Sequence, residues 1–220
     1  MVAEGFLFGG ALLLLSLLVA WLAGWGWAAP GFVLTAFVLY FFRDPERIIP
    51  AGDTIISPAD GRIMDVRQME LDGKPVWKIS IFLSIFNVHV NRAPIAGTIQ
   101  NVQYQKGQFL VASRPEASTK NEQNTVTIQG ERHTVTFRQI AGLIARRIVF
   151  RKKIGDRVEK GERVGLIRFG SRVDLFMPLE FSTAVKVGDI VQGGASIMAN
   201  LIQQESGVTA GAADARGAGK

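Results

Sequence analysis

The chain has 220 residues, a net charge of +6, a hydrophobic fraction of 48% and no cysteine. The absence of cysteine excludes disulfides, thiolate nucleophiles and cysteine-based zinc sites. The length allows one sizeable domain with an appendage, and the apolar excess is local, because no charged residue occurs from Gly5 to Phe42.

The N-terminal region, residues 1–43, is predicted to be a hydrophobic helical hairpin associated with a membrane. Phe6 to Ala23 is an almost unbroken apolar run, close to the length that spans a hydrocarbon core of about 30 Å. Gly24 to Gly31 interrupts the pattern, and the second run, Phe32 to Phe42, is short for a full span. A tilted hairpin and a re-entrant second arm both remain open.

Basic residues follow the second run, which predicts the orientation of the hairpin. Arg43 and Arg47 place the following domain on the cytoplasmic face of the cell membrane by the positive-inside rule. A cleaved signal peptide is the alternative, but the basic segment that such peptides begin with is missing.

Residues 44–203 are predicted to form a mainly β domain, a compact sandwich with a barrel-like core. Short apolar or alternating runs are separated by Gly, Asp and Pro, without a competing helical period. A Gly-Asp-x-Val-x-x-Gly frame at Gly155 and again at Gly188 predicts turns that join strands. Val102 to Asn124 is expected to be a loop, and 204–220 a disordered tail. The expected strands are Val76–Phe86, Thr125–Gln129, Thr134–Ile140, Arg147–Phe150 and Arg163–Phe169.

The positive charge is concentrated in one stretch and suits a domain that lies on an anionic membrane. Nucleic acid is a less favoured partner, because the chain has no nucleic-acid motif, and a solvated basic face is the neutral alternative. The stretch comprises Arg146, Arg147, Arg151, Lys152 and Lys153.

Gly170-Ser171 lies between two apolar segments, where such a pair is either a turn or a site of self-cleavage. Three other motifs precede it in order, and with it they resemble the short form of phosphatidylserine decarboxylase from about Asp44 to about Met198. The motifs are Ser57-Pro58-Ala59-Asp60-Gly61, the run from Phe86 to Arg92, and the run from Ile140 to Ile148.

This resemblance implies a proenzyme that cuts itself between Gly170 and Ser171. Ser171 attacks the preceding carbonyl, and elimination and hydrolysis convert it into a pyruvoyl group, the only cofactor expected, with no metal. The pyruvoyl forms a Schiff base with the amine of phosphatidylserine, and loss of carbon dioxide gives phosphatidylethanolamine. The two chains, 1–170 and 171–220, are expected to stay associated, and a homodimer remains open.

The resemblance also suggests roles for three other residues. His89 matches a family histidine with roles in substrate binding and decarboxylation, and Asp60 is implied to help activate Ser171. Arg92 stands where longer members have a second histidine, so either His89 serves both steps or Asp60 acts more directly. Arg92 is also a candidate for binding the substrate carboxylate or phosphate. His133 is interpreted as an exposed turn histidine.

Other classes of protein explain less of this pattern. A zinc peptidase needs more histidines than the two present. A biotinyl or lipoyl carrier shares the Gly-Asp-x-Val turns, but Lys186 lacks the setting of a modified lysine. A scaffolding β domain on a membrane leaves the ordered motifs unexplained. A related serine phospholipid, such as archaetidylserine, would present the same amine and carboxylate, so the lipid tail stays open.

Overall fold

The structure is a computed structural model and describes residues 1–114, 116–143, 147–168 and 170–202. The tail predicted to be disordered, 204–220, and Arg146 of the basic stretch lie outside the described residues. The proposed division of the chain at residues 43 and 203 stays a prediction.

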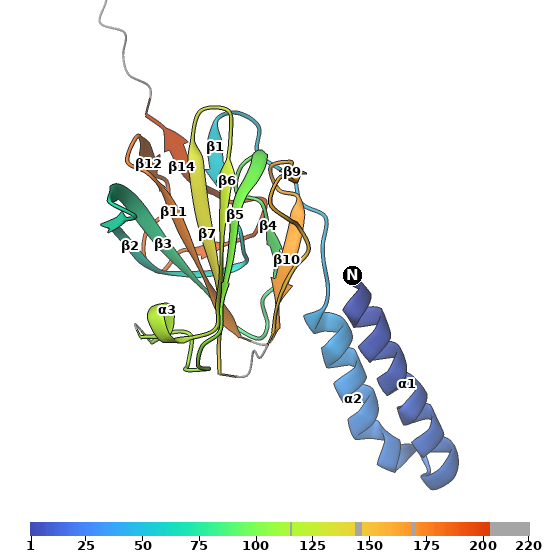
Figure 1. The fold of residues 1–220 in the computed structure, drawn as a ribbon. Coiled ribbons are helices and arrows are strands. Elements are labelled where there is room, and N and C mark those ends of the chain that lie inside the picture. The colour runs from blue at the N-terminus through green and yellow to red at the C-terminus, as the bar shows by residue number, and fades with distance from the viewer. Residues whose placement is uncertain (115, 144–146, 169, 203–220) are drawn as a thin grey trace, which may run out of the picture.

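The N-terminal region forms two antiparallel helices that lie side by side, as predicted (Figure 1). They are α1 (Ala3–Ala23) and α2 (Trp25–Phe41), and α1 is long and apolar enough to cross a membrane. The helices approach closely because glycines lie at the contact: a Cβ on Gly31 would overlap the Ser16 hydroxyl. The expected interruption from Gly24 to Gly31 is wrong in extent, because the turn needs only Gly24, at φ 95°, and α2 continues through Pro30.

An antiparallel eight-stranded sheet dominates the second part of the chain, and it curls into half a barrel (Figure 1). Its central pair is β11 and β7, which places the residue after Gly170 in the middle of the sheet. The strands in spatial order are β13 (Ile190–Val191), β2 (Gly61–Leu71), β3 (Lys74–Leu83), β11 (Ser171–Pro178), β7 (Thr134–Ala141), β6 (Gln123–Gln129), β5 (Gly97–Gln105) and β9 (Arg157–Val158).

Two three-stranded sheets complete the domain and enclose its apolar core, so the mainly β prediction is confirmed. Fully buried Ile, Val and Phe side chains from the large sheet form this core, Phe137 and Ile81 among them. One small sheet has the order β1 (Thr54–Ile56), β14 (Ile197–Leu201), β12 (Phe181–Thr183). The other has the order β4 (Val90–Arg92), β10 (Arg163–Ile167), β8 (Ile148–Phe150), and one short helix, α3 (Ala117–Lys120), precedes β6.

The two copies of the Gly-Asp-x-Val frame have the same local structure, as the repeat predicts. Gly155 and Gly188 adopt φ of 93° and 98°, which only glycine adopts without strain. Asp156 and Asp189 each accept a hydrogen bond from the backbone N–H three residues earlier, at 2.8 and 2.9 Å. Each frame then enters an edge strand, β9 or β13, at the two ends of the large sheet.

The predicted strands occur within a few residues of their expected positions, but the expected loop Val102–Asn124 is wrong at both ends. Its first residues complete β5, its last two begin β6, and α3 lies between these strands. The long strands β2, β5 and β11 were not predicted. β11 is buried on both faces, since Arg172 and Asp174 are as inaccessible as their apolar neighbours, and its sequence lacks an exposed polar alternation.

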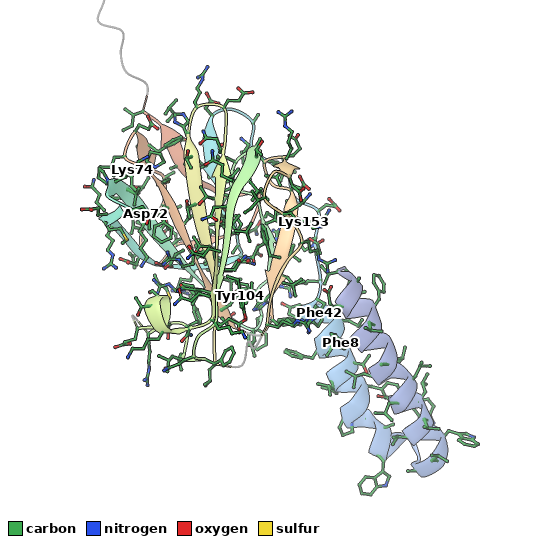
Figure 2. The ribbon with its side chains drawn as sticks, in the orientation of Figure 1. Phe8, Phe42, Asp72, Lys74, Tyr104 and Lys153 are labelled. Carbon is green, nitrogen blue, oxygen red and sulfur yellow. The ribbon has the colours of Figure 1, made fainter. Side chains whose placement is uncertain are left out.

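The hairpin meets the β domain through its own base, where Phe8 and Phe42 lie (Figure 2). Phe41 and Phe42 are buried with Leu166 of β10, and the N–H of Val2 donates to the carbonyl of Phe42 at 3.2 Å. The beginning of α1 and the end of α2 therefore lie together against the domain.

Candidate functional site

Ser171 is the first residue of β11, and it is fully buried. It lies opposite Ala141 of β7 and Leu83 of β3. Its hydroxyl oxygen has no hydrogen-bond partner among the described residues. A buried hydroxyl without a partner is unusual, because burial removes its hydrogen bonds to water, and such a group points to a chemical role.

His89 lies beside the bond that precedes Ser171. The Gly170 N–H donates to His89 Nε2 at 3.2 Å, and His89 Nδ1 lies 2.9 Å from the carbonyl oxygen of Asn87. A carbonyl can only accept, so Nδ1 carries the proton and Nε2 presents its lone pair to the Gly170 amide. The structure thus brings His89 and Gly170 together.

Burial lowers the pKa of His89 to about 4, and repulsion by Arg43 adds to this, while the hydrogen bond to Asn87 opposes it. His89 is therefore a neutral base at physiological pH.

The neutrality of His89 can be measured. The pKa of His89 in the folded protein lies below the ordinary 6.5, so on acidification the unfolded chain binds a proton at this histidine before the folded chain does. His89 therefore lowers the free energy of unfolding as the pH falls from about 6.5 towards 4. In the uncleaved Ser171→Ala chain, NMR titration should find His89 neutral at pH 5.5, where a free histidine is about 90% protonated. A midpoint near 6.5 would contradict the buried geometry.

The end of α2 holds the His89 loop. The Phe41 ring packs on the His89 ring with 4.3 Å between centroids. Arg43 Nη2 donates to the carbonyl of Phe86 at 2.7 Å, and the Tyr40 hydroxyl lies 3.4 Å from the same oxygen. The end of the hairpin is therefore part of the wall around His89.

Gly142 faces the carbonyl of Gly170 from the end of β7. A Cβ on Gly142 would lie closer to the Gly170 oxygen than real Cβ atoms come to any atom. Asn121, fully buried, fixes this region by donating to the carbonyls of Ala141 at 2.7 Å and Leu110 at 2.8 Å. Gly142 thus leaves the space that the carbonyl before Ser171 occupies.

Gly142→Ala is expected to slow any cleavage at Gly170-Ser171 by about tenfold or more, since a shift that costs 1.4 kcal/mol changes a rate tenfold. The rate is measured by following precursor and fragments on gels during synthesis in vitro. Gly26→Ala is the control, because a Cβ on Gly26 meets nothing within 4 Å. Cleavage at the normal rate in Gly142→Ala would show that the carbonyl does not need this space.

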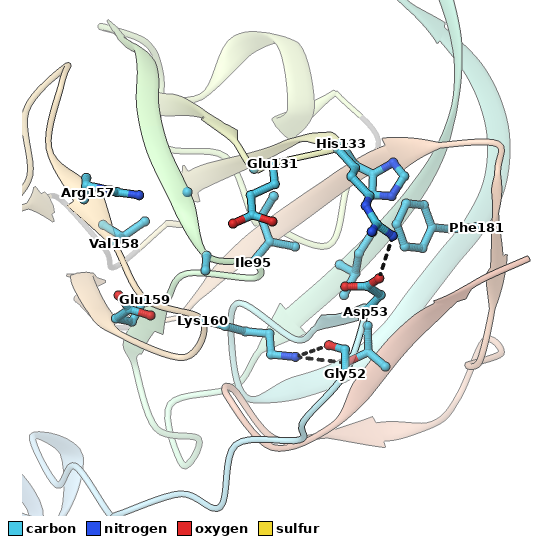
Figure 3. A pocket seen from close by; sticks show the side chains of 16 residues that line it. Gly52, Asp53, Ile95, Glu131, His133, Arg157, Val158, Glu159, Lys160 and Phe181 are labelled. Carbon is cyan, nitrogen blue, oxygen red and sulfur yellow. Dashed lines mark hydrogen bonds and ion pairs between the residues drawn. The ribbon is translucent and has the colours of Figure 1, made fainter.

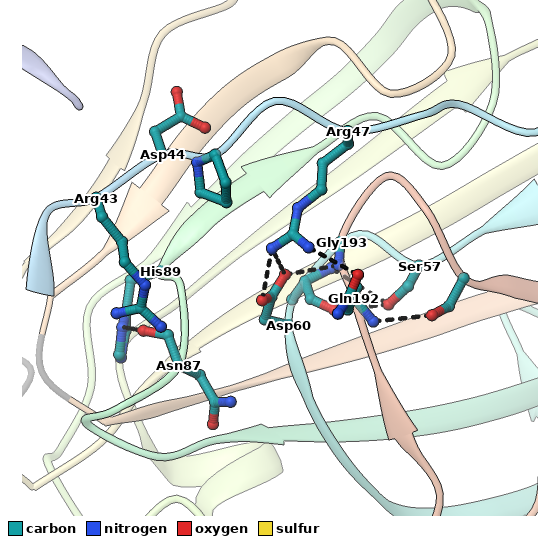
Figure 4. A network of polar contacts seen from close by, with 12 residues as sticks. Arg43, Asp44, Arg47, Ser57, Asp60, Asn87, His89, Gln192 and Gly193 are labelled. Atoms are coloured by element: carbon teal, nitrogen blue, oxygen red, sulfur yellow. Dashed lines mark hydrogen bonds and ion pairs between the residues drawn. The ribbon is translucent and has the colours of Figure 1, made fainter. Parts of the chain in front are cut away.

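Asp60 lies in a separate polar cluster (Figure 4). Its carboxylate accepts from Arg47 Nη2 at 2.8 Å and from the N–H of Gly193 at 2.7 Å. Burial raises the pKa of Asp60, and these two donors partly offset the rise. Within the described part of the chain, no hydrogen bond joins Asp60 to Ser171 or His89, so the structure does not assemble a contiguous triad.

Arg92 is also occupied by the segment after the hairpin. It forms an ion pair with Asp44 at 2.9 Å and donates to the carbonyls of Pro45 and Gly161, both at 3.1 Å. Burial lowers the pKa of Arg92, partly offset by Asp44. Through these contacts the Arg92 guanidinium holds the segment after the hairpin against the β domain. Substrate binding by Arg92 stays a prediction.

The contact between Asp60 and Arg47 predicts coupled mutational effects. If Asp60 acts by holding the segment after the hairpin, Asp60→Asn and Arg47→Gln should slow cleavage to a similar extent, and the double variant should be little worse than either. Cleavage rates of the three variants give the coupling. A much larger loss in Asp60→Asn alone would instead assign Asp60 a direct part in the chemistry.

The residues after Ser171 form a buried charged cluster that fixes β11. Arg172 Nε donates to Asp174 at 2.6 Å, Arg172 Nη2 donates to the Ser80 hydroxyl at 3.0 Å, and Lys78 pairs with Asp174 at 3.4 Å. Burial lowers the pKa of Lys78. Because removal of one partner would leave a buried charge unpaired, this cluster holds the start of β11 in one position.

The second histidine lies elsewhere. His133 lies in the connection between β6 and β7, where Nδ1 contacts Glu180 at 2.7 Å and the ring packs edge-on against Phe181. It lines a cavity of about 380 Å³ with Asp53 and Lys160 (Figure 3). Ser171 and His89 are not among the residues that line this cavity. No three His, Cys, Asp or Glu side chains gather as a metal site in the ranges that the structure describes.

Sequence reasoning missed several residues of the site. Gly142 and Asn87 lie within the quoted motifs, so their positions carried a signal, but the contacts that give them a role are long-range. Arg47, Phe41 and Asn121 carried no signal for a role in the site, because their partners lie 13 to 48 residues away.

Comparisons with known proteins identify the family of this chain. The sequence model of the family described as phosphatidylserine decarboxylase matches residues 34–199. The chain is 54% identical over 205 residues to a phosphatidylserine decarboxylase proenzyme of Solibacter usitatus, covering 93% of this chain and 98% of that protein. It is 45% identical over 202 residues to the proenzyme of Ralstonia nicotianae, covering 90% and 94%. With a match of this extent, which includes both sides of the Gly170-Ser171 bond, the chain belongs to the phosphatidylserine decarboxylase family.

Proposed function

We propose that this protein is a phosphatidylserine decarboxylase that matures by cutting itself between Gly170 and Ser171. The observation that carries the proposal is the buried Ser171 hydroxyl without a partner, beside a Gly170 that His89 and Gly142 enclose. The names of the relatives support the same activity and a precursor that is processed.

The first step is attack of Ser171 Oγ on the carbonyl carbon of Gly170. The bond from this carbon to the Ser171 nitrogen breaks, and an ester forms. Removal of the Ser171 α-proton then breaks the Cβ–O bond, which releases Gly170 as a carboxylate. The dehydroalanine that remains takes up water and loses ammonia, leaving a pyruvoyl group at residue 171.

Gly142 and His89 prepare this step. Gly142 leaves room for the Gly170 oxygen, which gains charge when Ser171 attacks. His89 is neutral, its Nε2 lone pair accepts from the Gly170 N–H at the reacting bond, and it takes the Ser171 proton after a small shift away from this amide. We assign Asp60 and Arg92 to holding the segment from Asp44 to Arg47 in place.

The position of Ser171 suits a pyruvoyl group, since it is buried and enclosed by two strands. Such a group supplies an electron sink for loss of carbon dioxide from a bound amino acid headgroup. His89 then holds or returns the proton at the carbon that loses carbon dioxide. Phosphatidylserine is the proposed substrate, and phosphatidylethanolamine the product.

The two chains are proposed to stay together after cleavage. β11 would belong to the small chain, yet it pairs along Ser171–Pro178 with β3 and along Ser171–Phe176 with β7 of the large chain. β13 and β14 likewise pair with β2 and β1. Separation would break the large sheet at its centre.

The helical hairpin is proposed to anchor residues 44–203 to the cell membrane on the cytoplasmic face. This is supported by the apolar length of α1 and by the adjacent positions of Val2 and Phe42, which place both ends of the hairpin on one side. Arg43 and Arg47 follow the hairpin directly, and the positive-inside rule places such basic residues on the cytoplasmic side.

Mass spectrometry of the purified protein tests the proposal. It should find a fragment 171–220 with a pyruvoyl N-terminus together with a fragment ending at Gly170, and release of carbon dioxide from phosphatidylserine. An intact chain as the only active species would overturn the self-cleavage mechanism, and cleaved protein without activity on phosphatidylserine would overturn the substrate.

A further inference from the structure

Three loops converge on Gly170. A Cβ on Gly170 would lie 3.9 Å from Ile85, and one on Gly142, which faces the Gly170 carbonyl, would lie 3.4 Å from Ala112. Ile85 follows β3, Ala112 precedes α3, and Gly142 follows β7. Segments far apart in the sequence therefore meet at the end of the large sheet where Ser171 lies.

Each of these three residues has an exposed apolar neighbour in the chain. Phe86 is 61% exposed, Val111 is 40% exposed and Leu143 is 58% exposed. Single exposed apolar side chains are common, but three on loops that surround one buried site form a surface that needs an explanation. We call Phe86, Val111 and Leu143 the apolar rim.

The Phe86 part of the apolar rim adjoins the base of the helical hairpin. The carbonyl of Phe86 accepts the hydrogen bond from Arg43, and it lies next to the Tyr40 hydroxyl at the end of α2. Tyr40 is itself about half exposed. Figure 1 shows α3 and the base of the hairpin at the same end of the β domain. A bilayer entered by the hairpin would thus reach the rim next.

The charges on the rim loops suit an anionic lipid surface. Exposed cations on them outnumber the acidic residues, which are Glu116 and Glu122, and basic residues near a membrane surface attract anionic lipids by about 1 kcal/mol each. The exposed cations are Lys106, Arg114, Lys120 and Arg147.

We propose that the apolar rim inserts into the interfacial layer of the bilayer that the hairpin enters, and that the lipid substrate passes from this layer between the three loops to residue 171. The rim then accounts for selection of lipid in a bilayer over the same headgroup in water. The proposal rests on the proposed function for its substrate, but insertion itself can be measured without turnover.

The first experiment locates the rim relative to lipid. Because the chain has no cysteine, Val111→Cys and Leu143→Cys each carry a single environment-sensitive fluorophore in the full-length protein. The protein is reconstituted in vesicles of phosphatidylcholine and phosphatidylglycerol at about four to one, an anionic surface that is not the substrate. A nitroxide on the lipid near the headgroup should quench both labels at least about twofold, as expected for side chains at the acyl boundary.

Ile202→Cys is the matched control, since Ile202 is 51% exposed. The Ile202 N–H donates to the carbonyl of Glu180, and the Glu180 carboxylate contacts His133. His133 lies eight residues, or about 26 Å of strand, from Ala141 at the other end of β7. The Ile202 label should therefore not be quenched. Rim labels as accessible to aqueous iodide as the Ile202 label would overturn the proposal. Rim labels shielded from both quenchers would also overturn it, because a second copy of the chain would then cover the rim.

The second experiment separates membrane contact from catalysis. The variant Phe86→Ser/Val111→Ser/Leu143→Ser should be cleaved normally and should keep activity within about twofold on a short-chain, water-soluble phosphatidylserine. On vesicles that contain long-chain phosphatidylserine, its activity should fall about tenfold or more, which corresponds to about 1.4 kcal/mol. Ile202→Ser should match the wild type on both substrates.

The outcomes distinguish the proposed insertion of the apolar rim from the proposed decarboxylase function. Equal losses on both substrates would assign the rim a structural role, and no loss on either would leave it without a role, so both results overturn the inference. If the wild type decarboxylates neither substrate while the rim labels are quenched by lipid, the proposed function fails and the membrane contact stands.

Discussion

Ser171→Ala is expected to leave the protein as one uncleaved chain with no decarboxylase activity. In the proposed mechanism the hydroxyl is the nucleophile, and its oxygen is the group expelled in the elimination, so without it neither the cleavage nor the pyruvoyl group can form. The folded structure should survive, since this hydroxyl has no hydrogen-bond partner in the part of the chain described, and removal of an unpaired buried polar group costs little. Gel analysis of processing, activity on phosphatidylserine and the melting temperature give the three measurements.

Ser182→Ala is the control for Ser171→Ala. Ser182 lies in β12, is exposed, and its hydroxyl donates to the carbonyl of Asn200. It should be cleaved and active like the wild type. Cleavage of the Ser171→Ala chain at Gly170, or activity of the uncleaved chain, would refute the assignment of Ser171.

His89→Ala is expected to lower decarboxylation by about a hundredfold or more, the usual effect of removing a general acid or base. Cleavage should slow as well, because Nε2 no longer holds the Gly170 amide next to Ser171. Measuring turnover per cleaved molecule, with the cleaved fraction taken from gels, separates the two effects. A loss confined to turnover would restrict His89 to decarboxylation.

His133→Ala is the matched control, because the chain has two histidines and His133 contacts Glu180 and Phe181 rather than Gly170. Its cleavage and turnover should stay near those of the wild type. Normal turnover in His89→Ala would refute His89 as the general acid or base of decarboxylation. A melting temperature several degrees lower in His89→Ala would be expected from the cavity left against Phe41, so turnover is measured well below it.

The hairpin and the mainly β class were predictable because they depend on patterns local in sequence. An uncharged run from Gly5 to Phe42 indicates an apolar environment whatever follows it, and the Gly-Asp-x-Val frame fixes its own turn through a positive φ at the glycine. Strand β11 escaped prediction because its polar side chains, Arg172 and Asp174, are buried and neutralise each other. Periodicity reports exposure only when one face of a strand meets water.

The sequence by itself determined the ordered motifs, the Gly170-Ser171 pair and the presence of His89, and these suffice for the family. Only the tertiary structure decided which nitrogen of His89 faces Gly170, that Gly142 leaves space for the carbonyl, and that Asp60 bonds to Arg47 rather than to Ser171. The physical reason is that hydrogen bonds and excluded volume act over a few ångströms between residues far apart in the chain. The Gly170-Ser171 pair is a turn or a scissile bond according to what packs around it, and in this fold His89 and Gly142 enclose it.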